Sequence, residues 1–146
     1  MSDELIDAIE RHDITRLADL LKAGADPNFD PPSQPSWVPL KLAVSEIDDG
    51  GPIDAVVLLL RHGARVDGLG DSSGVTPLLV AAMYGLVDAA RLLLAAGADP
   101  NARDDEGDSP LRLAVEKRNH PLAALLLRCG ADRTIHDSGG LSGMSA

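Results

Sequence analysis

The 146-residue sequence is poor in aromatic residues and in cysteine, and both shortages restrict the fold. Its three aromatic residues, 2% of the chain, are Phe29, Trp37 and Tyr84. A domain with one central core normally fills its volume with large rings, so this composition favours thin, closely spaced helices with small residues between them. Cys129 is the one cysteine, which excludes an internal disulfide and gives no sign of an oxidising compartment.

Long apolar runs and positive charge are also scarce. No apolar stretch approaches the roughly 20 residues that span a bilayer, and the acidic N-terminus "MSDELIDAIERHD" does not have the pattern of a signal peptide. We therefore expect a cytoplasmic protein. The formal net charge of −10 repels nucleic-acid phosphates and anionic membranes, so we expect neither as a partner. A basic protein surface matches this charge better.

Two short sequence elements recur along the chain. Gly-Ala pairs begin at positions 24, 63, 97 and 130, and prolines suited to helix starts lie at 39, 77 and 110. The interval from 97 to 130 is 33 residues, and the interval from 24 to 63 is longer. Such recurrence is typical of repeat proteins, in which neighbouring units bury a shared core.

The third unit, residues 74–104, indicates how one repeat folds. Thr76 is a good helix N-cap, and Pro77 suits the first helical position, where no N–H is needed. The pattern predicts a first helix that ends at Gly85, a second helix over about 87–96, and Gly97 as a left-handed C-cap residue. The residues expected to face inward are Leu78, Ala81, Ala82, Ala90, Leu93 and Leu94.

The run from Thr76-Pro77-Leu78 through Ala81-Ala82, Gly85 and Leu92-Leu93-Leu94 to Gly97-Ala98-Asp99 resembles an ankyrin repeat, with Leu79 in place of the family's usual His. The resemblance covers about residues 4–144. It implies one all-α ankyrin-repeat solenoid with projecting β-turn fingers, in which four helix-pair repeats precede the start of a fifth. The predicted repeats are 4–35, 36–73, 74–106, 107–139 and the partial 140–146. Because the fifth unit is incomplete, we expect that the repeat continues beyond Ala146 or that a partner or a second copy covers this end.

The copies differ in ways that predict local differences. The first begins directly in a helix whose outer face carries acidic residues, as an N-terminal cap should; these are Asp3, Glu4, Asp7 and Glu10. The second lacks the Thr cap at Val38, and four extra residues in "EIDDGG", 46–51, are placed between its helices. In the fourth, Arg118 stands where the third has Gly85, and Pro121 is expected to begin the second helix.

The sequence contains no recognisable catalytic, phosphate-binding, dinucleotide-binding or zinc motif. His12, His62, His120 and His136 fall at different phases of the repeat, and we expect them to face solvent or to cap helices. Cys129 takes a position that holds alanine in other units, which favours a structural small residue over a reactive thiol. We therefore expect neither an enzyme nor a metal or cofactor site.

The resemblance implies a non-catalytic scaffold for protein–protein interaction. Ankyrin proteins generally bind partners with the finger tips and the exposed face of the first helices, which together form a concave surface. Carried over position by position, the candidate partner-binding residues are Phe29, Trp37, Glu46, Met83, Tyr84, Arg103, Asp105, Glu106, Asp108, Glu116 and Lys117.

All three aromatic residues fall in this set, and aromatic anchors dominate interface energetics. Tyr84 aligns with the charged Arg11 and Lys117, which favours an exposed functional ring. Phe29 and Trp37 either anchor a partner or plug the irregular finger "DPPSQPSW".

The acidic run around Asp105 is either a solvated tip or a surface that steers a basic partner. Two other functions stay open. One is an acidic inhibitor or immunity-type protein that neutralises a basic enzyme or toxin. The other is the ankyrin portion of a larger protein whose effector domain lies beyond Ala146.

Overall fold

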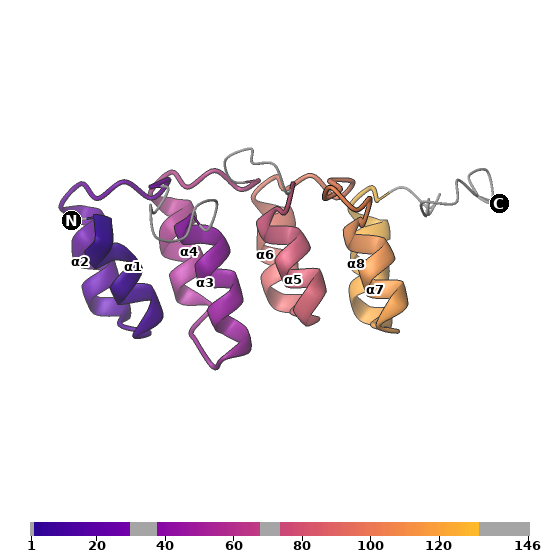
Figure 1. Ribbon diagram of the computed structural model, residues 1–146, viewed down its shortest axis with the longest axis horizontal. Coiled ribbons are helices and arrows are strands. Elements are labelled where there is room, and N and C mark those ends of the chain that lie inside the picture. The colour runs from indigo at the N-terminus through magenta and orange to yellow at the C-terminus, as the bar shows by residue number, and fades with distance from the viewer. Residues whose placement is uncertain (1, 30–37, 68–73, 132–146) are drawn as a thin grey trace. The chain divides into compact units, whose positions relative to one another are not determined.

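The computed structural model describes residues 2–29, 38–67 and 74–131, which form eight α-helices and no strand (Figure 1). This confirms the predicted all-α class. Trp37, His136 and the start of the predicted fifth repeat lie outside the described residues. The contacts divide the chain into two compact units, Met1–Gly70 and Asp71–Ala146.

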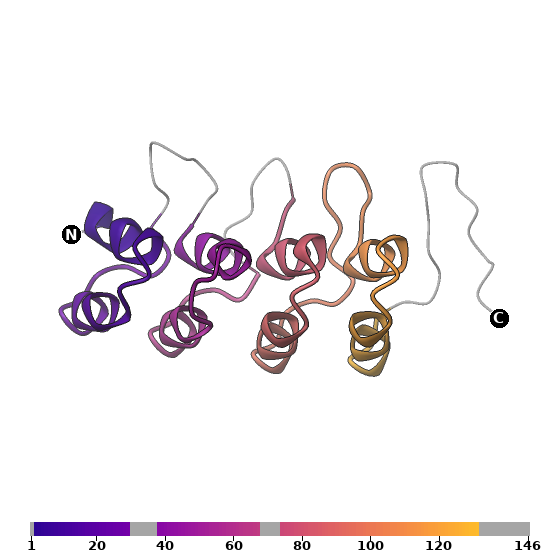
Figure 2. The ribbon, with the colours of Figure 1, turned by 90° about the horizontal axis from the view of Figure 1, so that it is seen from below.

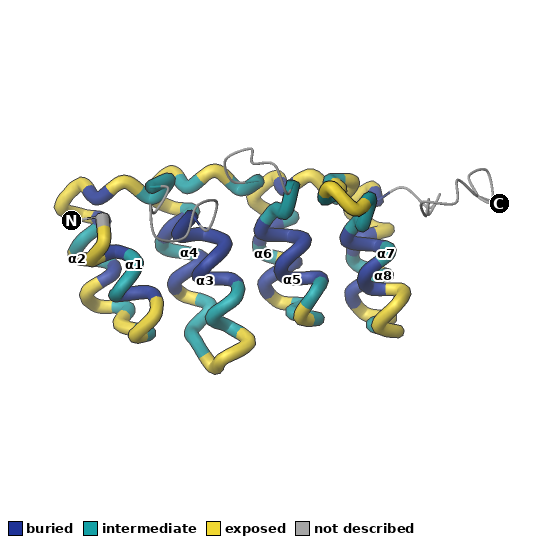
Figure 3. The backbone as a smooth tube through the Cα atoms, viewed as in Figure 1, coloured by how far each residue is buried: buried dark blue, intermediate teal, exposed yellow. Residues whose placement is uncertain are grey.

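The first unit contains two helix pairs. They are α1 (Ser2–Glu10), α2 (Ile14–Lys22), α3 (Pro39–Asp48) and α4 (Asp54–Arg61). Helix α1 packs on α2 and α3, and α4 packs on the same two helices. Leu5, Leu17, Leu40, Val44 and Leu59 are fully buried in this unit (Figure 3).

The second unit repeats the arrangement with helices α5 (Pro77–Tyr84), α6 (Val87–Ala95), α7 (Pro110–Glu116) and α8 (His120–Arg128). Helix α5 packs on α6 and α7, and α8 packs on the same two helices. Within each unit the two first helices lie in one layer and the two second helices in another (Figure 2). Of the six residues expected to face inward, five are buried and Leu94 is half-buried.

The predicted starts of the first helices in the second, third and fourth repeats are confirmed. The Thr76 hydroxyl oxygen accepts a hydrogen bond from the Leu79 N–H at 3.2 Å, and Ser109 caps α7 in the same way through the Arg112 N–H at 3.2 Å. Val38 precedes α3 without a side-chain cap. Each of these three helices has proline in its first turn, where the absent N–H leaves no bond unmade.

The connection between the helices of a pair needs a left-handed residue. Helix α5 ends before Gly85 as predicted, and Gly85 takes this left-handed place with φ +70°. The predicted left-handed residue after α6, Gly97, has φ +100°. Residues with a Cβ hold the positions equivalent to Gly85 in two other pairs, His12 with φ +58° and Arg118 with φ +55°. Because the left-handed region costs an L-residue roughly 1–2 kcal/mol, both connections carry backbone strain.

Two predicted boundaries are wrong. The residues 46–48 were expected to connect two helices, yet α3 continues through Asp48. The chain reverses only at glycine: the Gly51 N–H donates to the Glu46 carbonyl at 2.8 Å, and a Cβ at Gly51 would lie 2.7 Å from that oxygen. Helix α8 begins at His120 rather than at Pro121, because the Asn119 side chain accepts from the Leu122 N–H at 3.2 Å and so sets the cap one residue earlier.

Candidate functional site

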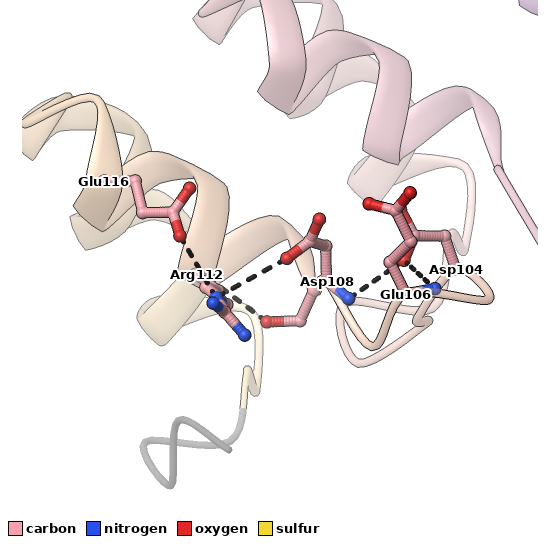
Figure 4. Close-up of polar contacts among 6 residues, drawn as sticks. Asp104, Glu106, Asp108, Arg112 and Glu116 are labelled. Carbon is pink, nitrogen blue, oxygen red and sulfur yellow. Dashed lines mark hydrogen bonds and ion pairs between the residues drawn. The ribbon is translucent and has the colours of Figure 1, made fainter. Parts of the chain in front are cut away.

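The finger that precedes α7 is held together by one of its acidic residues (Figure 4). Asp104 Oδ1 accepts hydrogen bonds from the backbone N–H groups of Glu106 and Asp108, both at 2.9 Å. The Asp104 N–H in turn donates to the Asp108 carbonyl at 3.1 Å. This carboxylate therefore builds the turn and is half-buried, whereas Asp105 and Glu106 remain exposed at the tip.

Arg112 binds two other acidic candidates inside the unit (Figure 4). Its Nε lies 3.1 Å from Glu116 Oε1 and 3.5 Å from Asp108 Oδ1. The side chains of Arg112 and Asp108 are only 25% and 23% exposed. The sequence analysis missed Arg112, although the i, i+4 spacing on either side of it is the ordinary signal for such pairs. Among the described residues of this finger, the charged side chains that are exposed are those of Arg103, Asp105 and Glu106.

A mixed apolar and charged surface lies at the ends of α5 and α7. Met83 and Tyr84 close α5, while Glu116 and Lys117 take the equivalent places at the end of α7, which packs against α5. Tyr84 is 45% exposed and Met83 half-buried. We call these four residues the α5–α7 surface. The structure therefore brings together four of the candidate residues that the sequence placed in separate repeats.

The candidates of the first unit are less accessible. Phe29 is half-buried after the turn in which its N–H donates to the Asp26 carbonyl at 3.3 Å. Glu46 is 19% exposed, and its Oε1 lies 3.2 Å from His12 Nε2. His12 was expected to be solvent-facing or capping, and the structure instead pairs it with a carboxylate on the neighbouring first helix. Any partner contact with Glu46 competes with this pair.

Asparagine side chains join the turns of neighbouring repeats within each unit, which the sequence analysis did not foresee. Asn28 Nδ2 donates to the Gly63 carbonyl at 3.1 Å, and Asn28 Oδ1 accepts from the Arg65 N–H at 2.9 Å. In the second unit, Asn101 Nδ2 donates to the Gly130 carbonyl at 3.2 Å. These bonds fix the base of each finger relative to the next turn.

The other two described histidines and the cysteine lie at separate helix ends. His62 is the exposed C-cap of α4, His120 is exposed at the start of α8, and Cys129 is the exposed C-cap of α8. Within residues 2–29, 38–67 and 74–131, no three His, Cys, Asp or Glu side chains are grouped to hold a metal ion. In the same part of the chain, no helix has the length and apolar character to cross a membrane.

Paired helices recurring with fingers between them define a helix-pair repeat protein, a class that acts through its surfaces. The family model described as ankyrin repeats (3 copies) matches residues 5–104 and 40–137. The chain therefore belongs to the ankyrin repeat family, as its Thr-Pro-Leu and Gly-Ala-Asp motifs predict. The repeats indicate a protein–protein interaction module.

Relatives of known description share this family. An ankyrin repeat-containing protein of Treponema pallidum is 43% identical over 103 residues, which are 70% of this chain and 33% of that protein. Protein phosphatase 1 regulatory subunit 27 of Homo sapiens is 40% identical over 68 residues, 47% of this chain and 44% of the subunit. The E3 ubiquitin-protein ligase KEG of Arabidopsis thaliana is 35% identical over 118 residues, 80% of this chain and 6% of the ligase. The chain thus spans a third or less of the treponemal protein and of the ligase.

Proposed function

We propose that this protein is a non-catalytic scaffold that binds a partner protein through the α5–α7 surface and the finger that leads into α7. The observation that carries the proposal is the exposure of Tyr84, 45%, beside Met83 at a helix end. Tyr84 is one of only three aromatic residues in the chain, and its ring is accessible to a partner. Tyrosine is enriched among residues that dominate binding energy, and methionine adapts to the shape of a partner.

Charge supplies the second part of the mechanism. Asp105 and Glu106 are exposed at the finger tip, whereas Asp108 and Glu116 are held by Arg112. We therefore assign the attraction of a basic partner mainly to Asp105 and Glu106, with Arg103 and Lys117 limiting which partners fit. Charges at an interface rim chiefly raise the association rate, and salt screens them. In the first unit, Phe29, Trp37 and Glu46 remain separate candidate contacts that come from the sequence.

The test starts from a partner identified by affinity capture and confirmed with both purified proteins. Tyr84→Ala should raise the dissociation constant by about thirtyfold or more, because an anchor residue contributes roughly 2 kcal/mol or more to the binding free energy. Leu127→Ala is the matched control, since Leu127 is 38% exposed but lies on α8. Isothermal titration calorimetry measures both affinities, and far-ultraviolet circular dichroism checks the fold. Equal affinities for Tyr84→Ala and the unchanged protein would exclude the anchor.

The charge assignment has its own measurement. The double variant Asp105→Asn and Glu106→Gln should slow association in stopped-flow experiments at low salt and leave dissociation nearly unchanged. An acidic inhibitor of a basic enzyme or toxin is a narrower form of the same function. It requires binding that weakens strongly with added salt, so an affinity that hardly changes between low and high salt contradicts it.

A second copy of the chain is another candidate partner, favoured by an exposed apolar side chain on α7. Val115 is 50% exposed, whereas Val44 and Ala82, at the equivalent place in their helices, are fully buried. Sedimentation equilibrium tests this: self-association through α7 should disappear in Val115→Glu, and a monomer at all concentrations excludes it.

A further inference from the structure

A groove of about 530 Å³ lies between α2 and α4, on the second-helix layer of the first unit. Its apolar part consists of Ile14 and Ala18 from α2, and Val57 and Leu58 from α4. Leu17, Leu21 and Leu59 on the same helices point into the core and are at most 4% exposed. The groove is therefore a second apolar strip on helices whose core-facing side is already used.

The groove is open on its α2 side because Ala18 has a short side chain. Ala18 lies six residues before Gly24, and the residue six before Gly97 is Arg91. In α6 this Arg91 is long, exposed and bonded to Asp88 at 3.0 Å. The same helix position thus accepts an arginine elsewhere in the chain, and its alanine in α2 leaves apolar side chains accessible.

Basic and acidic residues lie at opposite ends of the groove. Helices α2 and α4 finish at the same end, because Asn28 after α2 bonds to Gly63 after α4 at 3.1 Å. Lys22 and Arg61 line the groove at that C-terminal end, and Asp54 lines it at the opposite end. A further carboxylate, Asp19, lies along the α2 edge. Among the described residues, no ion pair or hydrogen bond engages any of these four side chains.

We propose that this groove binds an amphipathic helix of a partner protein, which lies antiparallel to α2 and α4. In that direction the first turn of the bound helix meets Lys22 and Arg61, and its last turn meets Asp54. Acidic residues in the first turn and basic residues in the last turn are also what a helix's own dipole favours. The groove from Ile14 to Lys22 spans about 12 Å at 1.5 Å per residue. The bound helix therefore contacts it with apolar residues at i, i+3 or i+4, and i+7.

A displayed library of 16-residue helical peptides, selected on the full chain, tests the groove. Counter-selection uses Ala18→Arg, which fills the groove with the residue that α6 carries at this position. The matched control is Ala124→Arg, the same change six residues before Gly130 on α8, where Ala124 is exposed. Peptides that depend on Ala18 should carry the apolar spacing, acidic residues in the first turn and basic residues in the last.

Titration of one selected peptide then gives the size of the effect. Ala18→Arg should weaken its affinity at least tenfold and Ala124→Arg less than twofold, with unchanged circular dichroism in both. The double variant Lys22→Glu and Arg61→Glu should weaken binding about fivefold. A peptide with its first-turn charges reversed should restore it.

Three results would overturn the proposal. The first is a selection that yields no binder sensitive to Ala18→Arg. The second is a set of such binders without the charge order, which would leave an apolar groove with no directional preference. The third is concentration-dependent NMR shifts of α2 and α4 without peptide, which would assign the groove to a second copy. None of these measurements involves Tyr84, so they stand apart from the function proposed above.

Discussion

The strained connection at Arg118 allows the contribution of one backbone angle to stability to be measured. Arg118 holds φ +55° at the place where Gly85 holds φ +70°, and its side chain is exposed. Replacement by glycine removes the left-handed strain of roughly 1–2 kcal/mol from the folded state. It also makes the unfolded chain more flexible, which opposes folding by about 0.5–1 kcal/mol. We expect Arg118→Gly to raise the free energy of unfolding by about 0.5–1 kcal/mol, which corresponds to a Tm increase of roughly 2–4 °C.

Two further variants complete this series. Gly85→Ala should lower stability by about 1 kcal/mol or more, since the left-handed cost now applies and the new Cβ would meet Asn119 Nδ2 at 3.2 Å. His12→Gly should change stability little, because relief at φ +58° is offset by loss of the 3.2 Å contact with Glu46, at about 0.5–1.5 kcal/mol.

Urea unfolding followed by circular dichroism measures all three variants, with the slope of each transition as the check on a common mechanism. The prediction depends on the order of the three changes more than on their absolute size. If Arg118→Gly is no more stable than the unchanged protein while Gly85→Ala is destabilised, the left-handed angle is not the source of strain at Arg118. If neither change has an effect, the whole argument from φ is refuted.

Two other predictions concern stability. Asp104→Ala should lower the free energy of unfolding by about 1–3 kcal/mol, because two backbone N–H groups lose their acceptor. Asp105→Ala, at the exposed tip, should lower it by less than about 0.5 kcal/mol. Equal urea midpoints for the two variants would show that the Asp104 carboxylate does not hold the finger. Val44→Ala should lower the free energy of unfolding by about 2 kcal/mol, because it removes two buried carbons and leaves a cavity, whereas Val115→Ala should change it little. The two side chains are 0% and 50% exposed. Thermal unfolding compares the variants, and a Val115 variant as unstable as the Val44 variant would mean that Val115 is covered in solution.

The fold could be predicted closely because its signals are local. Thr76, Pro77 and Gly85 act within one turn of the chain, and the period near 33 residues places the same signals in each unit. The error at 46–48 arose because the second repeat was aligned with the shorter third repeat. The extra residues were then assigned to the loop between the helices, although part of them lengthens the helix. The helix ends at a turn that two glycines form: Gly50 has φ +91°, and the Gly51 N–H bonds to the Glu46 carbonyl.

The candidate site could be predicted in part. Tyr84 was expected to be exposed from its alignment with Arg11 and Lys117, and it is. What the sequence could not settle was which charges are free, because that depends on side-chain rotamers and on neighbouring helices. Asp108 and Asp105 look alike in the sequence, yet Arg112 binds the first and leaves the second in solvent. The pairing of His12 with Glu46, 34 residues apart, likewise requires the packing of α1 on α3.

The bond between Asn28 and Arg65 has a consequence for hydrogen exchange. The Arg65 amide belongs to an exposed residue outside any helix, where exchange is ordinarily fast, but it is tied to a side chain 37 residues earlier. Its protection therefore depends on the first two repeats remaining docked and not on the integrity of a helix that contains it. This single amide reports the opening of one repeat from its neighbour, a local event that global unfolding curves average away.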